Sequence, residues 1–194
     1  MKAGRVCFSG MLLIVLLAAA IAASSSNDAT VAGMERKLQH VEKNGAAAKP
    51  DATPTEFSEQ EINAYFAAGK VDLPEGVKSV SFQLQPGLVT ATTHVDFDQL
   101  KQGRSSANPM LGVFSGVHDV AVSAHAYGAS GVGVVHVESV VLDGVEIPRF
   151  VLELFVENFI QPKYPQAGLD SHFALPDKIN SATIGSHKVT VIQR

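Results

Sequence analysis

The stretch RFVLELFVENFI, residues 149–160, decides the fold, because it reads as a helix that is apolar around most of its circumference. Its only polar residues are Arg149, Glu153, Glu157 and Asn158. Pro148 opens this helix at the first position, which proline favours. A helix of this kind is usually buried, so the rest of the chain must supply a surface that covers it.

Alternation of apolar and polar residues predicts that this surface is a β-sheet built from antiparallel hairpins. In the first hairpin we expect Gln85 opposite Leu88, and in the second we expect Tyr127 opposite Val132. Val145 to Ile147 adds a short strand after the turn at residues 143–144. The three hairpins are predicted over residues 80–97 around Pro86-Gly87, residues 117–142 around residues 128–131, and residues 179–192 around Gly185-Ser186.

The fold class expected is therefore α+β, a curled antiparallel sheet of six or seven strands wrapped around the apolar helix. Valine and alanine on the sheet leave room for the large side chains of residues 150–159. A second, short helix caps the domain. Ser58 and Glu61 form its capping box, and Gly69 ends it. We expect one domain over residues 55–194.

The first 23 residues have the three parts of a cleavable export signal. Lys2 and Arg5 precede an apolar run from Met11 to Ala23, and small residues follow. As a helix this run spans about 20 Å, less than the roughly 30 Å of a bilayer core. Cys7 precedes the run, whereas a lipoprotein cysteine would follow it. We expect export to the periplasm or the extracellular medium, with a retained signal as the alternative.

Removal of residues 1–23 leaves 13 basic and 19 acidic residues, a formal charge of −6 that argues against nucleic acid as a partner. It also leaves no cysteine, so the fold must rest on burial and backbone pairing without disulfides. Residues 24–54 have few large apolar side chains and predict a flexible tether, with one short helix near residues 31–43.

Residues 98–116 break both periodicities and predict a long loop with an apolar tip. Two interpretations stay open. The tip could gate a ligand or touch a membrane, or it could dock onto the domain's own core. If it is a gate, a hydrophobic slot between sheet and helix would be lined by Met110, Leu111, Phe114, Phe150, Leu154, Phe155 and Phe159.

No catalytic signature in the sequence has the residues and the spacing that its chemistry requires. Residues 128–131 lack the spacing of a nucleophile elbow, and Gly131-Val-Gly133 is followed by His136 where a dinucleotide fingerprint needs glycine. His125, His136 and Glu138 would share one face of the second hairpin and could in principle bind zinc. Strand histidines are more often solvated, so we predict no metal, no cofactor and no enzyme activity.

The order of elements resembles that of uncharacterised bacterial exported proteins. It runs from the Phe57-Ser-Glu-Gln-Glu-Ile-Asn-Ala-Tyr65 helix start, through the Pro-Gly hairpin and Val137-Glu-Ser-Val-Val-Leu-Asp-Gly-Val-Glu-Ile-Pro148, to the apolar helix and a terminal hairpin. The pattern is also similar to envelope proteins with half-barrel sheets of the tubular lipid-binding type. This resemblance covers residues 55–194, implies an envelope role with a hydrophobic ligand, and assigns no binding residue.

Two functions are consistent with these observations. The first is an exported, non-enzymatic envelope protein that binds a lipid or another hydrophobic small molecule between sheet and helix. The second is a structural or protein-interaction module of the envelope that has no ligand. Membrane contact is expected only through a retained signal or through residues 98–116. The width of apolar surface on the 149–160 helix separates the two functions, because a helix that the sheet covers completely leaves no slot.

Overall fold

A computed structural model describes residues 24–104 and 106–194, so the predicted signal peptide lies outside the described residues. The helices are α1 (Ser24–Ala46), α2 (Glu59–Ala67), α3 (Phe97–Leu100), the 3-10 helix η1 (Pro109–Val113), α4 (Arg149–Phe155) and the π-helix η2 (Val156–Ile160). The strands are β1 (Thr55–Ser58), β2 (Ser81–Gln85), β3 (Leu88–Asp96), β4 (Val117–Ala129), β5 (Val132–Leu142), β6 (Val145–Glu146), β7 (Asp170–Ala174), β8 (Ile179–Gly185) and β9 (Lys188–Gln193).

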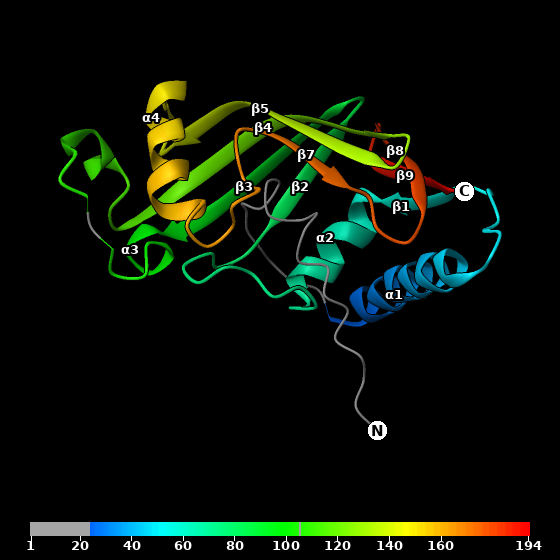
Figure 1. The fold of residues 1–194 in the computed structure, drawn as a ribbon. Coiled ribbons are helices and arrows are strands. Elements are labelled where there is room, and N and C mark those ends of the chain that lie inside the picture. Colours follow the sequence, from blue (N-terminus) through cyan, green and yellow to red (C-terminus); the bar gives the residue numbers. More distant parts are fainter. Residues whose placement is uncertain (1–23, 105) are drawn as a thin grey trace.

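These strands form one open, antiparallel sheet of nine strands, in keeping with the α+β class (Figure 1). The prediction of six or seven strands is too low because it misses β1 and β7, which are only four and five residues long. The long strand β4 organises the sheet. One of its edges pairs with β5, and the other pairs first with β3 and then with β8. Gly128 allows the second contact, since a Cβ there would lie 2.9 Å from the backbone nitrogen of Ala182.

The β2–β3 hairpin has the predicted register, with Gln85 opposite Leu88. The register predicted for β4 and β5 is wrong by two residues next to the turn, because Val132 pairs with Ala129 and not with Tyr127, and by three beyond the bulge between Ser123 and Ala124. The turn consists of Ser130 and Gly131 alone, with φ of 52° and 78°. Positive φ at both central residues is typical of the tight two-residue turn that matches strand twist. The turn of the last hairpin lies one residue later than predicted, because Gly185 pairs with Lys188.

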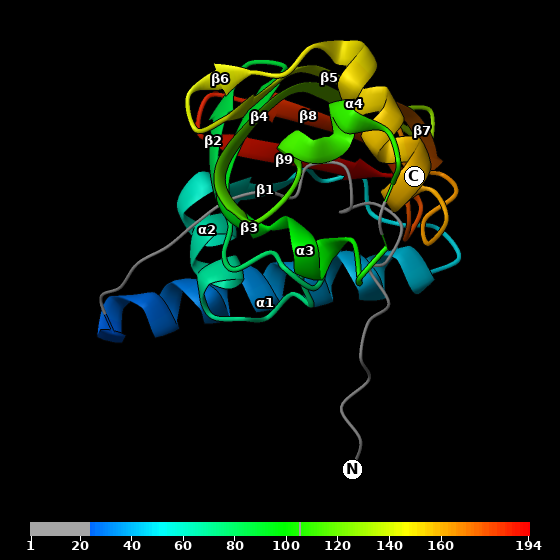
Figure 2. The same cartoon turned by 90° about the vertical axis from the view of Figure 1, so that its left-hand side faces the viewer.

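The sheet does not wrap completely around α4, which lies against one end of the sheet and leaves one flank in solvent (Figures 1 and 2). Val151, Leu152 and Phe155 are buried, whereas Phe150 is 52 % exposed. The expectation of a fully enclosed helix is therefore too strong. The buried face of α4 packs into the largest hydrophobic cluster, together with the inner faces of β4 and β5.

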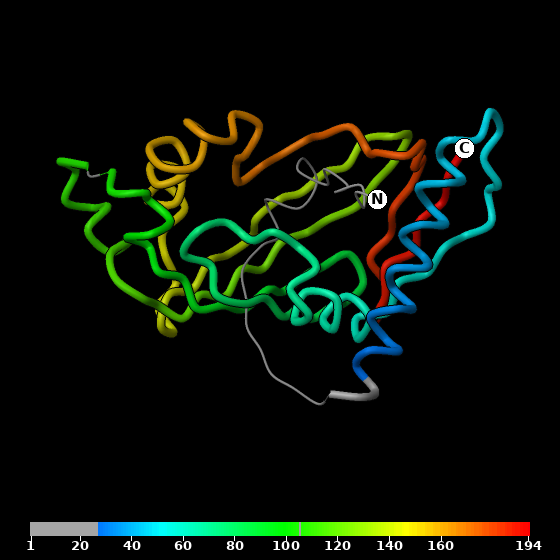
Figure 3. Tube along the Cα trace, turned by 90° about the horizontal axis from the view of Figure 1, so that it is seen from below, coloured from blue at the N-terminus to red at the C-terminus, as the bar shows by residue number. Residues whose placement is uncertain are grey.

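The helix α1 occupies residues where the sequence predicts a flexible tether, and it contains the short helix expected near residues 31–43. It packs against α2 and β9 at the end of the molecule opposite α4 (Figure 3). Val31, Met34 and Val41 are buried in this contact. Helix α2 begins at the predicted capping box, in which Ser58 Oγ accepts from the backbone N–H of Glu61 at 3.2 Å.

Candidate functional site

The candidate site lies at the α4 end of the sheet, where a buried aromatic cluster is covered by a thin apolar surface. The ring of Phe155 lies 4.2 Å from that of Phe114, 5.3 Å from that of Phe159 and 5.6 Å from that of Phe97. Ring separations of this size are typical of favourable aromatic contacts. The cluster joins α3, the residue after η1, α4 and η2, so four short helical elements meet in it.

Residues 108–116, called here the η1 segment, cover this cluster. Leu111 and Phe114 insert into the cluster and are 4 % and 2 % exposed. In the described part of the chain, residues 108–114 hydrogen-bond only to residues 106–115, through contacts such as Met110 N–H to Asn108 Oδ1 at 3.0 Å. Side-chain packing alone therefore holds the centre of the segment on α4, and such segments open more readily than paired strands.

Several apolar side chains on the elements of this end are exposed. Of the seven large hydrophobic side chains that are exposed in the described residues, five belong to η1, the start of β4, β6 and α4. Exposed apolar side chains mark binding surfaces where they form a contiguous patch. The five are Met110 and Val113 on η1, Val117 on β4, Val145 on β6 and Phe150 on α4.

The helix that carries the site changes its winding halfway. After Phe155 the α-helix continues as the π-helix η2, in which the N–H of Gln161 donates to the carbonyl oxygen of Val156 at 2.9 Å. The carbonyl oxygen of Phe159 accepts from the Arg104 guanidinium at 3.2 Å. π-helical turns are rare, and they frequently occur at functional sites.

His118 lies beside the aromatic cluster, with its ring 5.9 Å from that of Phe97. Its Nδ1 is 2.6 Å from Oδ2 of Asp143, and its Nε2 is 2.7 Å from the carbonyl oxygen of Ser115. The bond to Asp143, followed by that to Ser115, raises the pKa of His118. The same bond, together with the backbone N–H of Asp119, lowers the pKa of the Asp143 carboxyl.

Other histidines pair with carboxylates on the exposed face of the sheet. His136 on β5 contacts Asp170 on β7, which also binds Arg149, and the contact with His136 is the main cause that lowers the pKa of Asp170. His125 lies directly opposite His136 in the register and 3.6 Å from Glu138. The three residues that the sequence placed on one face therefore do lie together.

Among the described residues no three histidine, cysteine or carboxylate side chains are arranged to hold a metal ion. Within the described residues, the hydrogen-bond partners of His118, His125, His136 and His187 are carboxylates and carbonyl oxygens, not serine hydroxyls. These contacts join strands to neighbouring strands or turns, and in the case of His187 a turn to α2.

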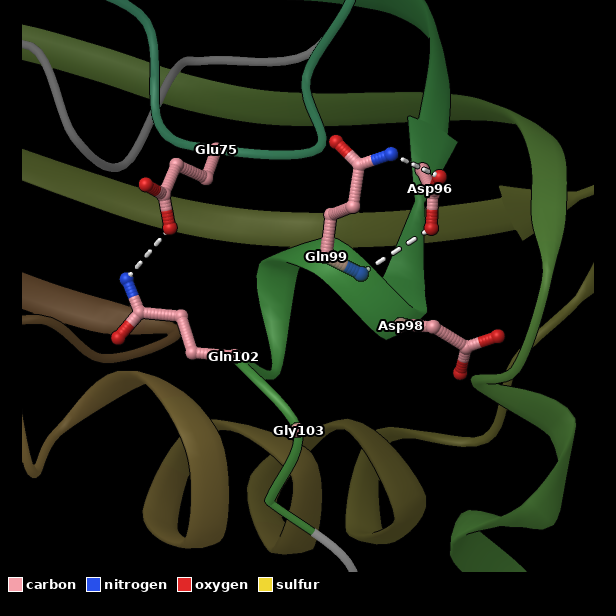
Figure 4. Close-up of a pocket in the computed structure, with 6 residues that line it drawn as sticks. All are labelled: Glu75, Asp96, Asp98, Gln99, Gln102 and Gly103. Atoms are coloured by element: carbon pink, nitrogen blue, oxygen red, sulfur yellow. Dashed lines mark hydrogen bonds between the residues drawn. The ribbon is translucent and has the colours of Figure 1, made fainter.

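A separate, shallow cavity of about 670 Å³ lies where α3 meets the preceding loop (Figure 4). Its lining is polar and is already hydrogen-bonded internally. Asp96 accepts from Gln99, and Glu75 accepts from Gln102 at 3.0 Å. Asp98 binds Lys101 at 3.1 Å. These polar groups already bind one another, and the cavity is wide open to solvent, so it does not enclose a ligand.

The structure brings the seven predicted slot residues to one end of the molecule but does not make all of them accessible. Leu111, Phe114, Phe155 and Phe159 fill the interior. Leu154 is half-buried, and Met110 and Phe150 face solvent at 43 % and 52 % exposure.

Sequence reasoning placed Val113 in the apolar tip of the 98–116 loop but missed Val117, Val145 and His118 as parts of this surface. The two valines belong to runs that the alternation assigned to strands. His118 was assigned to a strand face without its partner across the turn. The proximity of Asp143 to His118 is a consequence of the long β4–β5 pairing, in which Val120 lies opposite Leu142.

The chain matches no protein-family model, no curated protein and no solved structure in the three comparisons made with known proteins. Within residues 24–104 and 106–194 there is no helix that combines the length and the hydrophobicity required to span a bilayer.

Proposed function

We propose that the protein is a non-enzymatic binding module, exported to the periplasm or the extracellular medium, that holds the acyl chain of a lipid at the α4 end of its sheet. The observation that carries this proposal is the buried aromatic cluster, together with exposed Met110 on η1 and exposed Phe150 on α4, the two elements that hold the cluster between them. The resemblance of the element order to tubular lipid-binding domains supports the same ligand class.

The site is proposed to form between the η1 segment and α4. Movement of the segment away from α4 would withdraw Leu111 and Phe114 and leave Phe155 and Phe159 to contact the ligand. The curled sheet then supports the other side of α4, where Val151 and Leu152 are buried. Half-buried Leu154 lies on the same helix and would line the path from the surface.

The chemistry of the lining favours an acyl chain over a peptide. A bound peptide needs partners for its backbone N–H and C=O groups. Residues 108–114 satisfy their hydrogen bonds within the segment, and no buried side-chain nitrogen or oxygen of the described residues lacks a partner. The site therefore has hydrocarbon and aromatic surface to contribute and few free polar groups, which suits a ligand without hydrogen-bonding groups along its length.

The alternative function, a structural or interaction module without a ligand, is favoured by one observation. Leu111 and Phe114 already fill the space beside Phe155, as the aromatic contact at 4.2 Å requires. In that case the five exposed apolar side chains would serve a protein partner, and added lipid would have no effect.

Lipid binding can be tested directly. Mass spectrometry of the purified mature protein after gentle organic extraction should find a lipid. Oleic acid or dioleoyl phosphatidylcholine should raise the melting temperature by roughly 3 °C at saturating concentration. Absence of both a co-purified lipid and a thermal shift would reject the proposal.

Point variants locate the site. Phe150→Ser and Met110→Ser should each weaken oleic acid binding by about tenfold, because each removes apolar area that the ligand would cover. Tyr127→Ser is the matched control, since Tyr127 is 56 % exposed but lies at the far end of β4. Equal loss of binding in the control variant would place the lipid elsewhere.

A further inference from the structure

His118 holds the η1 segment through a ring that donates from both nitrogens. The carbonyl oxygen of Ser115 can only accept a hydrogen bond, and so can an ionised carboxylate. Both contacts of the ring, to Asp143 at 2.6 Å and to Ser115 at 2.7 Å, are therefore satisfied together only by the imidazolium cation. A neutral ring has one N–H and must give up one of the two contacts.

Three hydrogen bonds attach the end of the segment to its surroundings. The first is the bond from His118 to Ser115. In the second, the N–H of Phe97 donates to the carbonyl oxygen of Gly116 at 2.8 Å. In the third, the N–H of Gly116 donates to Asp98 Oδ2 at 3.0 Å. Lys101, and then this N–H, lowers the pKa of Asp98, so Asp98 stays charged above the acid range. Of the three bonds, only the one from His118 depends on a proton that is lost near neutral pH.

We infer that His118 is a latch, which as a cation fastens the η1 segment over α4 and on losing its proton releases it, so that pH regulates access of an acyl chain. This inference rests on the proposed function, because the η1 segment is the part that covers the proposed acyl site. His118 is a positioning residue in this scheme and does not contact the ligand.

The sign of the pH effect follows from the direction of the shift. The pKa of His118 is raised in the folded protein, so the latch is complete below the ordinary value of 6.5 and weakens as the pH rises through the raised value. The Asp143 carboxylate is the neighbouring charge that favours the cation, and burial opposes it. Other titratable and charged groups lie on the elements around His118. On the strands and the turns beside them they are Asp143 after β5, Asp119 on β4 with its partner His94 on β3, and Asp96 with its partner Lys78. On the helices they are Asp98 and its partner Lys101 at α3, and Arg149, Glu153 and Glu157 on α4 and η2.

The latch can be tested without any lipid by amide hydrogen exchange of residues 108–116. At about pH 5.5, where histidine is charged, His118→Gln should exchange in this segment at least about threefold faster than the wild type. At about pH 8.5 the ratio should fall toward one, because the wild type has lost the same charge. His187→Gln is the control, since His187 binds Glu59 at the opposite end of the molecule. The latch is overturned if His118→Gln and the wild type exchange equally slowly at the lower pH, or if the ratio of their exchange rates is the same at both pH values.

Asp143→Asn provides a second variant that keeps the histidine. Asp143 adopts φ of 48°, a conformation that asparagine tolerates well, so the turn is expected to fold. Removal of the carboxylate should lower the pKa of His118 measured by NMR titration and shift the onset of fast exchange to lower pH. An unshifted titration would overturn the inference even if His118→Gln failed to fold.

Oleic acid uptake separates this inference from the proposed function. If both stand, the wild type should take up oleic acid faster at about pH 8.5 than at about pH 5.5, and His118→Gln should be fast at both. If amide exchange of residues 108–116 depends on pH and on His118 as expected, but oleic acid is not taken up at any pH, lipid binding is rejected and the latch is kept. Uptake that is equally fast at both pH values in the wild type would reject the latch and keep lipid binding.

Discussion

Phe150 and Phe155 stand five residues apart on one helix, and their surroundings differ. Phe155 is 7 % exposed and contacts three other phenylalanine rings, whereas Phe150 is 52 % exposed. The buried ring contributes to stability through packing, and the exposed ring contributes little to it. Packing of the core therefore accounts for Phe155, whereas Phe150 is available to contact the proposed ligand.

This contrast gives a prediction at the level of single residues. Phe155→Ala should lower the free energy of unfolding by about 3–5 kcal/mol, because it leaves a cavity among the rings. Phe150→Ala should change it by less than about 1 kcal/mol. Urea unfolding of both variants measures the difference. A loss of similar size in the two variants would mean that Phe150 is packed in solution.

Sequence reasoning identified the seven slot residues by their hydrophobicity and could not divide them into buried and exposed. The division depends on where α4 ends relative to η1, which lies more than thirty positions earlier in the chain. Periodicity along one element gives the direction of a side chain on that element. It does not give the contacts that a distant loop adds, and the burial of Leu111 and Phe114 is such a contact.

At the scale of elements, the first hairpin and α2 could be predicted because local signals fix them. Pro86-Gly87 sets the register of β2 and β3, and Ser58 with Glu61 fixes the start of α2. The turn at Ser130-Gly131 was predicted as four residues because a valine-rich strand pairs almost equally well after a shift of two residues, which keeps the same faces inward between the turn and the bulge at Ser123 and Ala124. Only a short helix near residues 31–43 was predicted where the longer α1 lies, because its apolar positions are few and its stability comes from docking.

The docking of α1 depends on Gln193, the last residue of β9, which is 3 % exposed. Its amide donates to the carbonyl oxygens of Val41 at 2.8 Å and Asp177 at 2.6 Å, and its oxygen accepts from Asn44 at 2.8 Å. Gly45 permits this close approach, since a Cβ there would lie 2.4 Å from the carbonyl oxygen of Asp177. One side chain therefore joins the C-terminal strand, α1 and the loop before β8.

Gln193→Leu should therefore loosen α1. Two buried carbonyl groups would lose their donor, at a cost of roughly 2 kcal/mol or more. Limited proteolysis should cleave α1 faster in this variant, while the η1 segment keeps its amide protection. Gln39→Leu makes the same replacement on the exposed face of α1 and should leave cleavage unchanged. If both variants are cleaved at the wild-type rate, α1 is held by its apolar contacts alone.

At the scale of the whole molecule, the lowered pKa of Glu61 and the raised pKa of His118 limit the pH range in which both residues stabilise the fold. Burial is the largest single influence on Glu61 and raises its pKa, but the hydrogen bonds from Lys37 and Ser58 outweigh it, so the net effect lowers the pKa. The stability that Glu61 contributes is therefore present above the ordinary value of 4.5 and is lost as the pH falls through the lowered value. His118, with its raised pKa, contributes stability below pH 6.5 that is lost on the alkaline side.

The free energy of unfolding should accordingly reach its maximum in the mildly acidic range. One variant should weaken its dependence on pH on the acid side of this maximum, and a second variant should do so on the alkaline side. Glu61→Gln should lower stability by roughly 1–2 kcal/mol at neutral pH and by less as the pH falls through the lowered pKa of Glu61, because the wild-type carboxylate is then protonated as well. His118→Gln should lower it most near pH 5.5 and least near pH 8.5. Urea unfolding across this range measures both. A uniform loss at every pH in either variant would show that its contribution is packing and not charge, and for His118 it would also remove the basis for a pH-dependent latch.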